Sequence, residues 1–107
     1  MTTQINVYKS DKLYDLNFTL KDANDAAIDI TGCTILFKAQ KSGAAANKFS
    51  GTGAIVSGPA GTCKYTVQAT DFDEAGDYYA EVEVTFVGGK ILTFGDILVR
   101  VKPELPR

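Results

Sequence analysis

The sequence predicts an all-β protein, because apolar and polar residues alternate in short segments that are separated by turn-forming residues. The clearest alternation follows an acidic turn and spans residues 77–87. Alternation with a period of two places one face of a strand on a core and the other face in solvent. No long helix is expected, so the segments favour an antiparallel β-sandwich of about seven strands.

The start of this strand indicates an immunoglobulin-like sandwich. In such domains a tyrosine near the start of the corresponding strand, two positions before the usual cysteine, packs inward and hydrogen-bonds back to the preceding corner. Tyr78 holds the tyrosine position shortly after Gly76, and Ala80 holds the cysteine position. We therefore predict a single immunoglobulin-like domain over residues 1–107, in which Gly76 and Tyr78 have structural roles.

Six further segments are expected to be strands, because each is bounded by glycine, proline or polar turn residues. They span residues 5–8, 13–20, 33–41, 52–57, 62–68 and 90–102. Residues 28–32 are expected to lead into a strand in extended conformation, and residues 42–51 to form a loop. A single helical turn is predicted for residues 70–76, since Asp71 and Glu74 have the spacing of a capping box.

A two-residue turn at Gly88-Gly89 would place Val87 opposite Lys90 and Asp77 opposite Arg100. In this register Glu81 faces Asp96, an unfavourable pair of like charges that a bulge at Gly95-Asp96 would relieve. The outward face then carries a contiguous apolar set, which is typical of an interface. Its members are Tyr79, Val87, Leu92, Phe94 and Leu98. The alternative is that these residues are scattered on the surface, or that a slip in register buries some of them.

Composition excludes several classes of function. The chain has 107 residues, of which 45% are hydrophobic and 22% charged, and its net charge is −2. Lysine and arginine are scattered, so no basic stripe is available for nucleic acid. The N-terminus does not resemble a signal peptide, and no apolar run is long enough to span a membrane. We therefore expect synthesis in a cytosol, with neither a nucleic acid nor a membrane as partner.

Cys33 and Cys63 are both expected near the starts of strands, facing inward. A bridge between them would close a loop of roughly 30 residues and contribute ~3–4 kcal/mol in the chain-entropy model. Because a cytosolic chain is expected, we favour two reduced thiols in the core and leave the bridge as the alternative. Neither thiol is predicted to be a nucleophile, since the chain contains no histidine and no base lies nearby in sequence.

Acidic residues gather in two turns but do not predict a metal or catalytic site. The first turn holds Asp22, Asn24, Asp25 and Asp29, and an EF-hand would need ligands or glycine where Ala26, Ala27 and Cys33 stand. The second turn holds Asp71, Asp73, Glu74 and Asp77, for which capping and the tyrosine corner suffice as explanations. Glycoside hydrolysis needs two acids in one cleft, which these positions do not suggest. We predict no enzymatic activity, cofactor or metal.

Several short motifs occur together in this chain. Residues 17–22 end a strand in an acidic turn, and residues 28–33 make an apolar-Asp-apolar-Thr-Gly step into the strand that holds Phe37-Lys38. Gly76-Asp77-Tyr78 and Gly89-Lys90 follow. From about Leu13 to Val101 this pattern resembles the N-terminal immunoglobulin-like domain of bacteriophage baseplate upper proteins. The sequence departs from the family pattern at Asp25-Ala26, where a glycine is usual, and at Cys33, where a small residue is usual.

The resemblance implies a non-enzymatic structural protein of a phage or prophage virion, in the tail, baseplate or head surface. Such a protein would dock onto other virion proteins, often in symmetric multiples, so a homo-oligomer is a further expectation. It would pass through the host cytoplasm during assembly. The alternative is a carbohydrate or cell-surface adhesion module of a virion. That function requires exposed aromatic side chains, and without tryptophan the candidates are Tyr8, Tyr14, Tyr65 and Tyr79.

Overall fold

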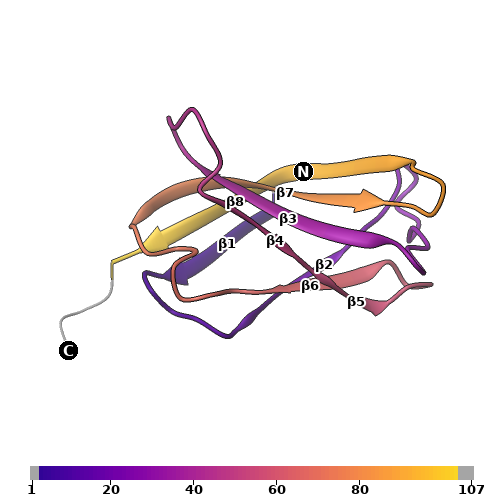
Figure 1. Ribbon diagram of the computed structural model, residues 1–107, viewed down its shortest axis with the longest axis horizontal. Coiled ribbons are helices and arrows are strands. Elements are labelled where there is room, and N and C mark those ends of the chain that lie inside the picture. Colours follow the sequence, from indigo (N-terminus) through magenta and orange to yellow (C-terminus); the bar gives the residue numbers. More distant parts are fainter. Residues whose placement is uncertain (1–2, 104–107) are drawn as a thin grey trace.

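A computed structural model describes residues 3–103, which form eight β-strands and no helix. Five strands build one sheet in the order β1-β8-β7-β3-β4, and three build a second sheet in the order β2-β6-β5 (Figure 1). All strand pairs are antiparallel except β1 with β8. The strands are β1 (Thr3–Tyr8), β2 (Asp15–Thr19), β3 (Thr34–Lys41), β4 (Phe49–Thr52), β5 (Ala54–Ser57), β6 (Thr62–Thr66), β7 (Gly76–Thr85) and β8 (Ile91–Lys102).

This arrangement confirms the predicted all-β immunoglobulin-like sandwich, since β2, β6 and β5 form one layer and β3, β7 and β8 lie together in the other. Within residues 3–103 there is no helix with the length and apolar character that a membrane span requires.

The core forms where the inward side chains of the two sheets meet. Phe37 of β3 is fully buried at its centre. Its ring stacks on Tyr65 of β6 at 4.9 Å and on Phe18 of β2 at 5.7 Å between ring centroids. Phe72 packs edge-to-face on Tyr78 at 5.2 Å. Aromatic pairs of this geometry stabilise a core by ~0.5–1.5 kcal/mol each beyond the area that they bury.

The β7–β8 hairpin follows the predicted register in only one of its halves. The backbone N–H of Phe86 donates to the carbonyl of Lys90 at 2.7 Å, so the loop holds Val87 as well as Gly88 and Gly89. The two glycines have φ of 101° and 98°, values that favour glycine. The loop is therefore one residue longer than predicted, and every side chain of β8 between the loop and the bulge is turned to the opposite face.

A β-bulge then restores the predicted register. The pairing shifts between Ala80 and Val82 of β7, opposite the segment that contains Gly95 and Asp96. Asp96 has a left-handed φ of 58°, which is typical of such an irregularity. From this point Asp77 lies opposite Arg100, as predicted. The bulge predicted at Gly95-Asp96 is confirmed.

Two other local predictions are wrong. Residues 49–57 form two strands in different sheets, because the chain crosses between the layers at Gly53. A Cβ at Gly53 would lie 2.7 Å from the carbonyl oxygen of Lys64, so only glycine fits at this crossing. A turn over residues 69–72 replaces the helical turn that was predicted for residues 70–76, and β7 already begins at Gly76. The carboxylate of Asp71 accepts a hydrogen bond from the backbone N–H of Gln68 at 2.8 Å. The side chain of Asp71 therefore points toward the preceding residues and does not cap the residues that follow it.

Candidate functional site

The outer surface of the five-stranded sheet brings two of the predicted interface residues side by side. Tyr79 of β7 lies opposite Leu98 of β8. The alternate residues of both strands are buried, so Tyr79 and Leu98 point away from the core. Tyr79 is 60% exposed, and Leu98 is half-buried. Gln40 and Gln4 flank the two residues on the neighbouring strands. We call Tyr79 and Leu98 the outer pair.

The other three predicted interface residues do not join the outer pair. Leu92 and Phe94 lie opposite Val84 and Val82, which are buried, and Phe94 packs against the core. Their predicted outward orientation is wrong, because the longer hairpin loop reverses the two faces of β8 at these positions. Val87 is 87% exposed, but it lies in the loop at the end of the hairpin. The predicted contiguous patch of five residues is therefore not formed.

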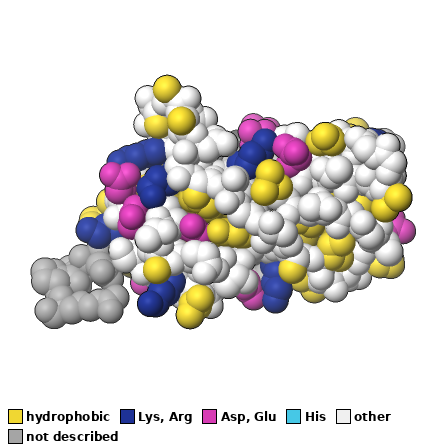
Figure 2. Space-filling view, in the orientation of Figure 1, with side chains coloured by type: hydrophobic (Ala, Val, Ile, Leu, Met, Phe, Trp, Pro, Cys, Tyr) yellow, Lys and Arg dark blue, Asp and Glu magenta, His cyan; other side chains and the backbone are white. Residues whose placement is uncertain are grey.

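Two ion pairs lie on the same sheet face, whereas the exposed Glu81 of this face forms no ion pair with residues 3–103. The Nζ of Lys38 lies 2.8 Å from the Oε2 of Glu83, and the Nε of Arg100 lies 3.1 Å from the Oδ1 of Asp77. The hydrogen bond to Glu83 raises the pKa of Lys38. The Lys38–Glu83 pair is partly buried and the Arg100–Asp77 pair is exposed. Exposed pairs contribute only ~0–1 kcal/mol to stability. Figure 2 likewise shows acidic and basic side chains intermixed on the face in view. Near the outer pair, recognition can therefore use apolar contact at Tyr79 and Leu98 together with the charge of Glu81 on the same face.

Tyr78 forms the predicted tyrosine corner. Its ring is fully buried, and its hydroxyl donates to the backbone carbonyl of Glu74 at 2.8 Å. Burial is the largest cause of the raised pKa of this phenol, followed by the negative charges of Glu74 and Asp73. Gly76 has a φ of 136°, so it supplies the backbone conformation that lets the chain turn into β7.

Replacing Tyr78 by phenylalanine is expected to lower the free energy of unfolding by about 1 kcal/mol, because the corner loses one hydrogen bond and keeps the ring. Chemical denaturation measures the change. Tyr79→Phe is the matched control, since it removes an exposed hydroxyl from the adjacent residue, and it should leave stability unchanged. Equal stability of the two variants would show that the corner bond contributes nothing.

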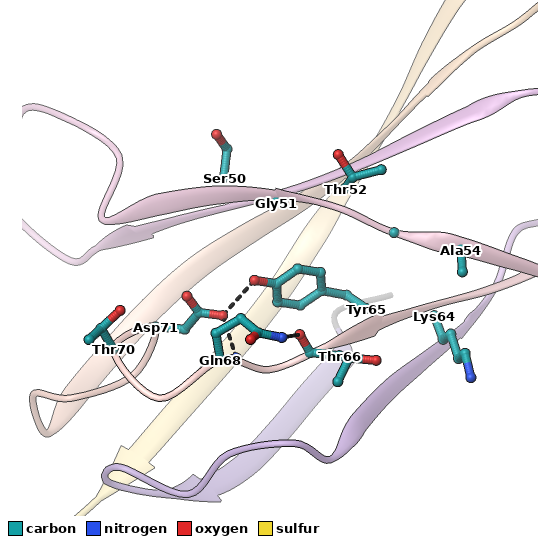
Figure 3. A pocket seen from close by; sticks show the side chains of 11 residues that line it. Ser50, Gly51, Thr52, Ala54, Lys64, Tyr65, Thr66, Gln68, Thr70 and Asp71 are labelled. Atoms are coloured by element: carbon teal, nitrogen blue, oxygen red, sulfur yellow. Dashed lines mark hydrogen bonds between the residues drawn. The ribbon is translucent and has the colours of Figure 1, made fainter.

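A polar groove lies between β4 and β6, where the chain crosses between the sheets (Figure 3). Its volume is about 470 Å³. Tyr65 extends across the gap between these strands, and its hydroxyl donates to the Oδ2 of Asp71 at 2.5 Å. A Cβ at Gly51 would lie 2.5 Å from the ring of Tyr65, so glycine is needed for the ring to pass. The remaining lining residues include Ser50, Thr52, Lys64, Thr66, Gln68 and Thr70.

The groove lacks the arrangement that acid–base catalysis requires. Asp71 is the one carboxylate among its lining residues, and it already accepts hydrogen bonds from the Tyr65 hydroxyl and the Gln68 backbone. Burial and the bond to Asp71 raise the pKa of Tyr65, so its phenol stays protonated at neutral pH. Lys64 pairs with Asp15 at 3.4 Å. The Tyr65–Asp71 bond therefore ties β6 to the following turn.

The two cysteines are free thiols, as the sequence favoured, and the alternative bridge between them is not formed. Cys63 is buried, and Cys33 is half-buried. Burial raises the pKa of both thiols, and the charge of Asp29 adds to the effect at Cys33. A raised pKa reduces the fraction of thiolate, which is the reactive form.

The acidic turn at residues 22–26 uses its oxygens locally. The Oδ1 of Asp22 accepts the backbone N–H groups of Asn24 and Ala26 at 2.8 and 3.0 Å. Asp25 lies 3.5 Å from Lys21. No group of three or more histidine, cysteine, aspartate or glutamate side chains in residues 3–103 is placed to hold a metal ion.

The sequence did not indicate a second groove, which lies between β2 and β8 and has a volume of about 630 Å³. We call it the edge groove. Its lining residues are Thr3, Asn17, Phe18, Thr19, Leu20, Lys21, Asp22, Asp25, Phe94, Gly95 and Ile97. The groove exists because β1 begins to pair with β8 only at Ile97. This parallel pairing does not arise from a hairpin, so the sequence contains no local signal for it.

Comparison with known proteins gives one family. The model of the BppU N-terminal domain matches residues 1–104, which is nearly the whole chain. No curated protein matches the sequence significantly. The match agrees with the motifs at residues 17–22, 28–33 and 76–78 and with the sandwich that they form. The chain therefore belongs to the family of BppU N-terminal domains, the N-terminal domains of phage baseplate upper proteins, which are structural components of the virion.

Proposed function

We propose that this chain is a single non-enzymatic module that binds other virion proteins through the outer face of its five-stranded sheet. Family membership supports a role in the baseplate. The observation that carries the choice of surface is the outer pair, where an exposed tyrosine lies beside a half-buried leucine on neighbouring strands. Tyrosine is enriched at protein interfaces, because it offers a large apolar area together with a hydroxyl for hydrogen bonding.

Baseplate function also favours several copies of the domain in one particle, each making the same contact, because closed assemblies repeat one interface by symmetry. The module would fold in the host cytoplasm before it joins the particle. The ion pairs that flank the outer pair would orient the partner without contributing much affinity, since exposed charge pairs act mainly on specificity and association rate.

Replacing Tyr79 by glutamate is expected to reduce incorporation of the protein into phage particles by about tenfold or more, because a charge at an interface centre costs at least ~2 kcal/mol. Quantitative mass spectrometry of purified particles measures the incorporation. The matched control is Val56→Glu, since Val56 is 58% exposed on β5 of the opposite sheet. Normal incorporation of the Tyr79 variant, or an equal loss with the Val56 variant, would exclude the outer pair. Both variants should keep the melting temperature of the parent.

The adhesion alternative has less support from the positions of the tyrosines. Tyr65 is buried and Tyr14 is half-buried, and neither ring is free to stack on a sugar. Burial raises the pKa of Tyr14 to about 12. Tyr8 and Tyr79 are exposed, but they lie on different strands, with Tyr8 on β1 opposite Lys102 and Tyr79 on β7 opposite Leu98. Protein–protein contact therefore remains the function that we propose.

A further inference from the structure

β1 covers only one half of β8. It pairs with β8 from Ile97 to Lys102, and Figure 1 shows it beside the C-terminal part of that strand. The preceding segment, Ile91–Asp96, lies against β7 on one edge. No other strand among residues 3–103 pairs with its second edge. We call the segment from Ile91 to Gly95 on this second edge the open edge.

The open edge presents hydrogen-bonding groups of the backbone. The carbonyl of Lys90 accepts the N–H of Phe86, so Lys90 directs its backbone groups toward β7. Backbone groups alternate in direction along a strand, and the paired residues from Ile91 to Phe94 follow one register with β7. Ile91 and Thr93 therefore direct their N–H and C=O groups away from β7, toward the open edge.

The open edge lacks the features that usually protect a strand edge. Natural proteins protect such edges with lysine, proline, inward charges or bulges. The segment from Ile91 to Gly95 contains no charged residue and no proline, and the bulge comes at its end, where Asp96 has a φ of 58°. An apolar, uncharged segment of β-forming residues on an unpaired edge is suited to pairing with another chain.

The edge groove adjoins the open edge and provides an apolar floor. Phe18 and Phe94 are partly buried within it, and Leu20 and Ile97 are buried. Its volume of about 630 Å³ falls within the range of ~300–1,000 Å³ that is typical of ligand pockets. A strand added to β8 in line with β1 would place alternate side chains over this floor.

We infer that the open edge binds an extended segment of another polypeptide, which adds a strand to β8 and inserts apolar side chains into the edge groove. The pairing of β1 with β8 already shows that this edge of β8 accepts a strand. A single strand fits better than a second copy of the domain, because β2 borders the same groove and stands in the way of another rigid sandwich. The inference rests on the proposed function only for the identity of the partner as a virion protein.

The test uses a display library of random 12-residue peptides selected on the purified domain. Selected peptides should carry apolar residues at alternate positions, and in NMR exchange experiments they should slow the exchange of the Ile91 and Thr93 amides about tenfold or more. Thr93→Pro should abolish binding, since it removes the N–H at the open edge and blocks an approaching strand. Thr93→Val is the matched control and should bind normally, because it keeps the N–H and adds no charge at the edge.

Four results would overturn the inference. The first is that no peptide binds above background, and the second is that bound peptides protect other amides or still bind the Thr93→Pro variant. The third is that the domain protects the same amides by itself as its concentration rises, which would make a second copy the occupant. A loss of fold is excluded if Thr93→Pro keeps the exchange protection of the Leu92 and Phe94 amides. The fourth result is that the Thr93→Pro variant is incorporated normally into particles while the Tyr79→Glu variant is not. This result would reject the open edge and leave the proposed function intact.

Discussion

Replacing Phe37 by alanine is expected to lower the free energy of unfolding by about 3–5 kcal/mol, the range for a buried aromatic residue. Phe37 is fully buried between the two sheets, and its ring contacts aromatic rings from β2, β4 and β6. Small domains have a total stability of only ~5–15 kcal/mol. The variant should therefore be unfolded at a much lower urea concentration than the parent, as circular dichroism in a denaturant series would show.

Phe86→Ala provides the control for this experiment, since it is the same substitution at the end of the hairpin. Phe86 is only partly buried, and its ring has Lys90 above it at 5.3 Å. A partly exposed ring loses less transfer free energy on truncation and leaves a smaller cavity. The loss of stability should be about half or less of that at Phe37. Equal losses would mean that Phe37 is not the centre of the core.

Replacing Gly61 by alanine is the second substitution with a large expected effect, about 3 kcal/mol of lost stability. Gly61 has a φ of 70°, which disfavours any side chain. A Cβ at this position would also lie 2.7 Å from the carbonyl oxygens of both Leu20 and Ile28. These atoms belong to the backbone, so they cannot move aside without disturbing the hydrogen bond from the N–H of Ile28 to the carbonyl of Leu20.

Gly43→Ala separates the two causes. Gly43 has a φ of 85°, and a Cβ there would meet nothing within 4 Å. It therefore carries the conformational cost alone, about 1 kcal/mol. The difference between the two variants, measured by thermal or chemical denaturation, should be about 2 kcal/mol, which is the cost of the contact. If Gly61→Ala is no worse than Gly43→Ala, the turn before β6 is not packed as described.

The sequence was most informative where one side chain or one charge pair decides the local structure. The acidic turn before Tyr78 and the alternation after it were enough to place the tyrosine corner and the inward face of β7. The clash between Glu81 and Asp96 was enough to locate the bulge. In both cases the interaction that fixes the structure lies within one strand or between two consecutive strands.

Prediction failed where structure depends on a single residue of loop length or on distant partners. The sequence Gly88-Gly89 suits a two-residue turn, yet the loop also takes in Val87, and this one residue moved Leu92 and Phe94 from the surface to the core side. The crossing at Gly53 depends on how two consecutive hairpins, β3–β4 and β5–β6, are divided between the sheets. The parallel pairing of β1 joins it to β8, the last strand in the chain order. Of the candidate site, the outer pair was therefore identified, while the edge groove was not.

Photo-cross-linking from position 79 in assembled particles tests the central claim most directly, because it reports what touches the outer pair in the virion. A photoreactive phenylalanine analogue in place of Tyr79 is predicted to give a covalent adduct with another virion protein, and the same analogue at Val56 is predicted to give none. An adduct from position 56 with none from position 79 would contradict the account and assign the contact to the opposite sheet.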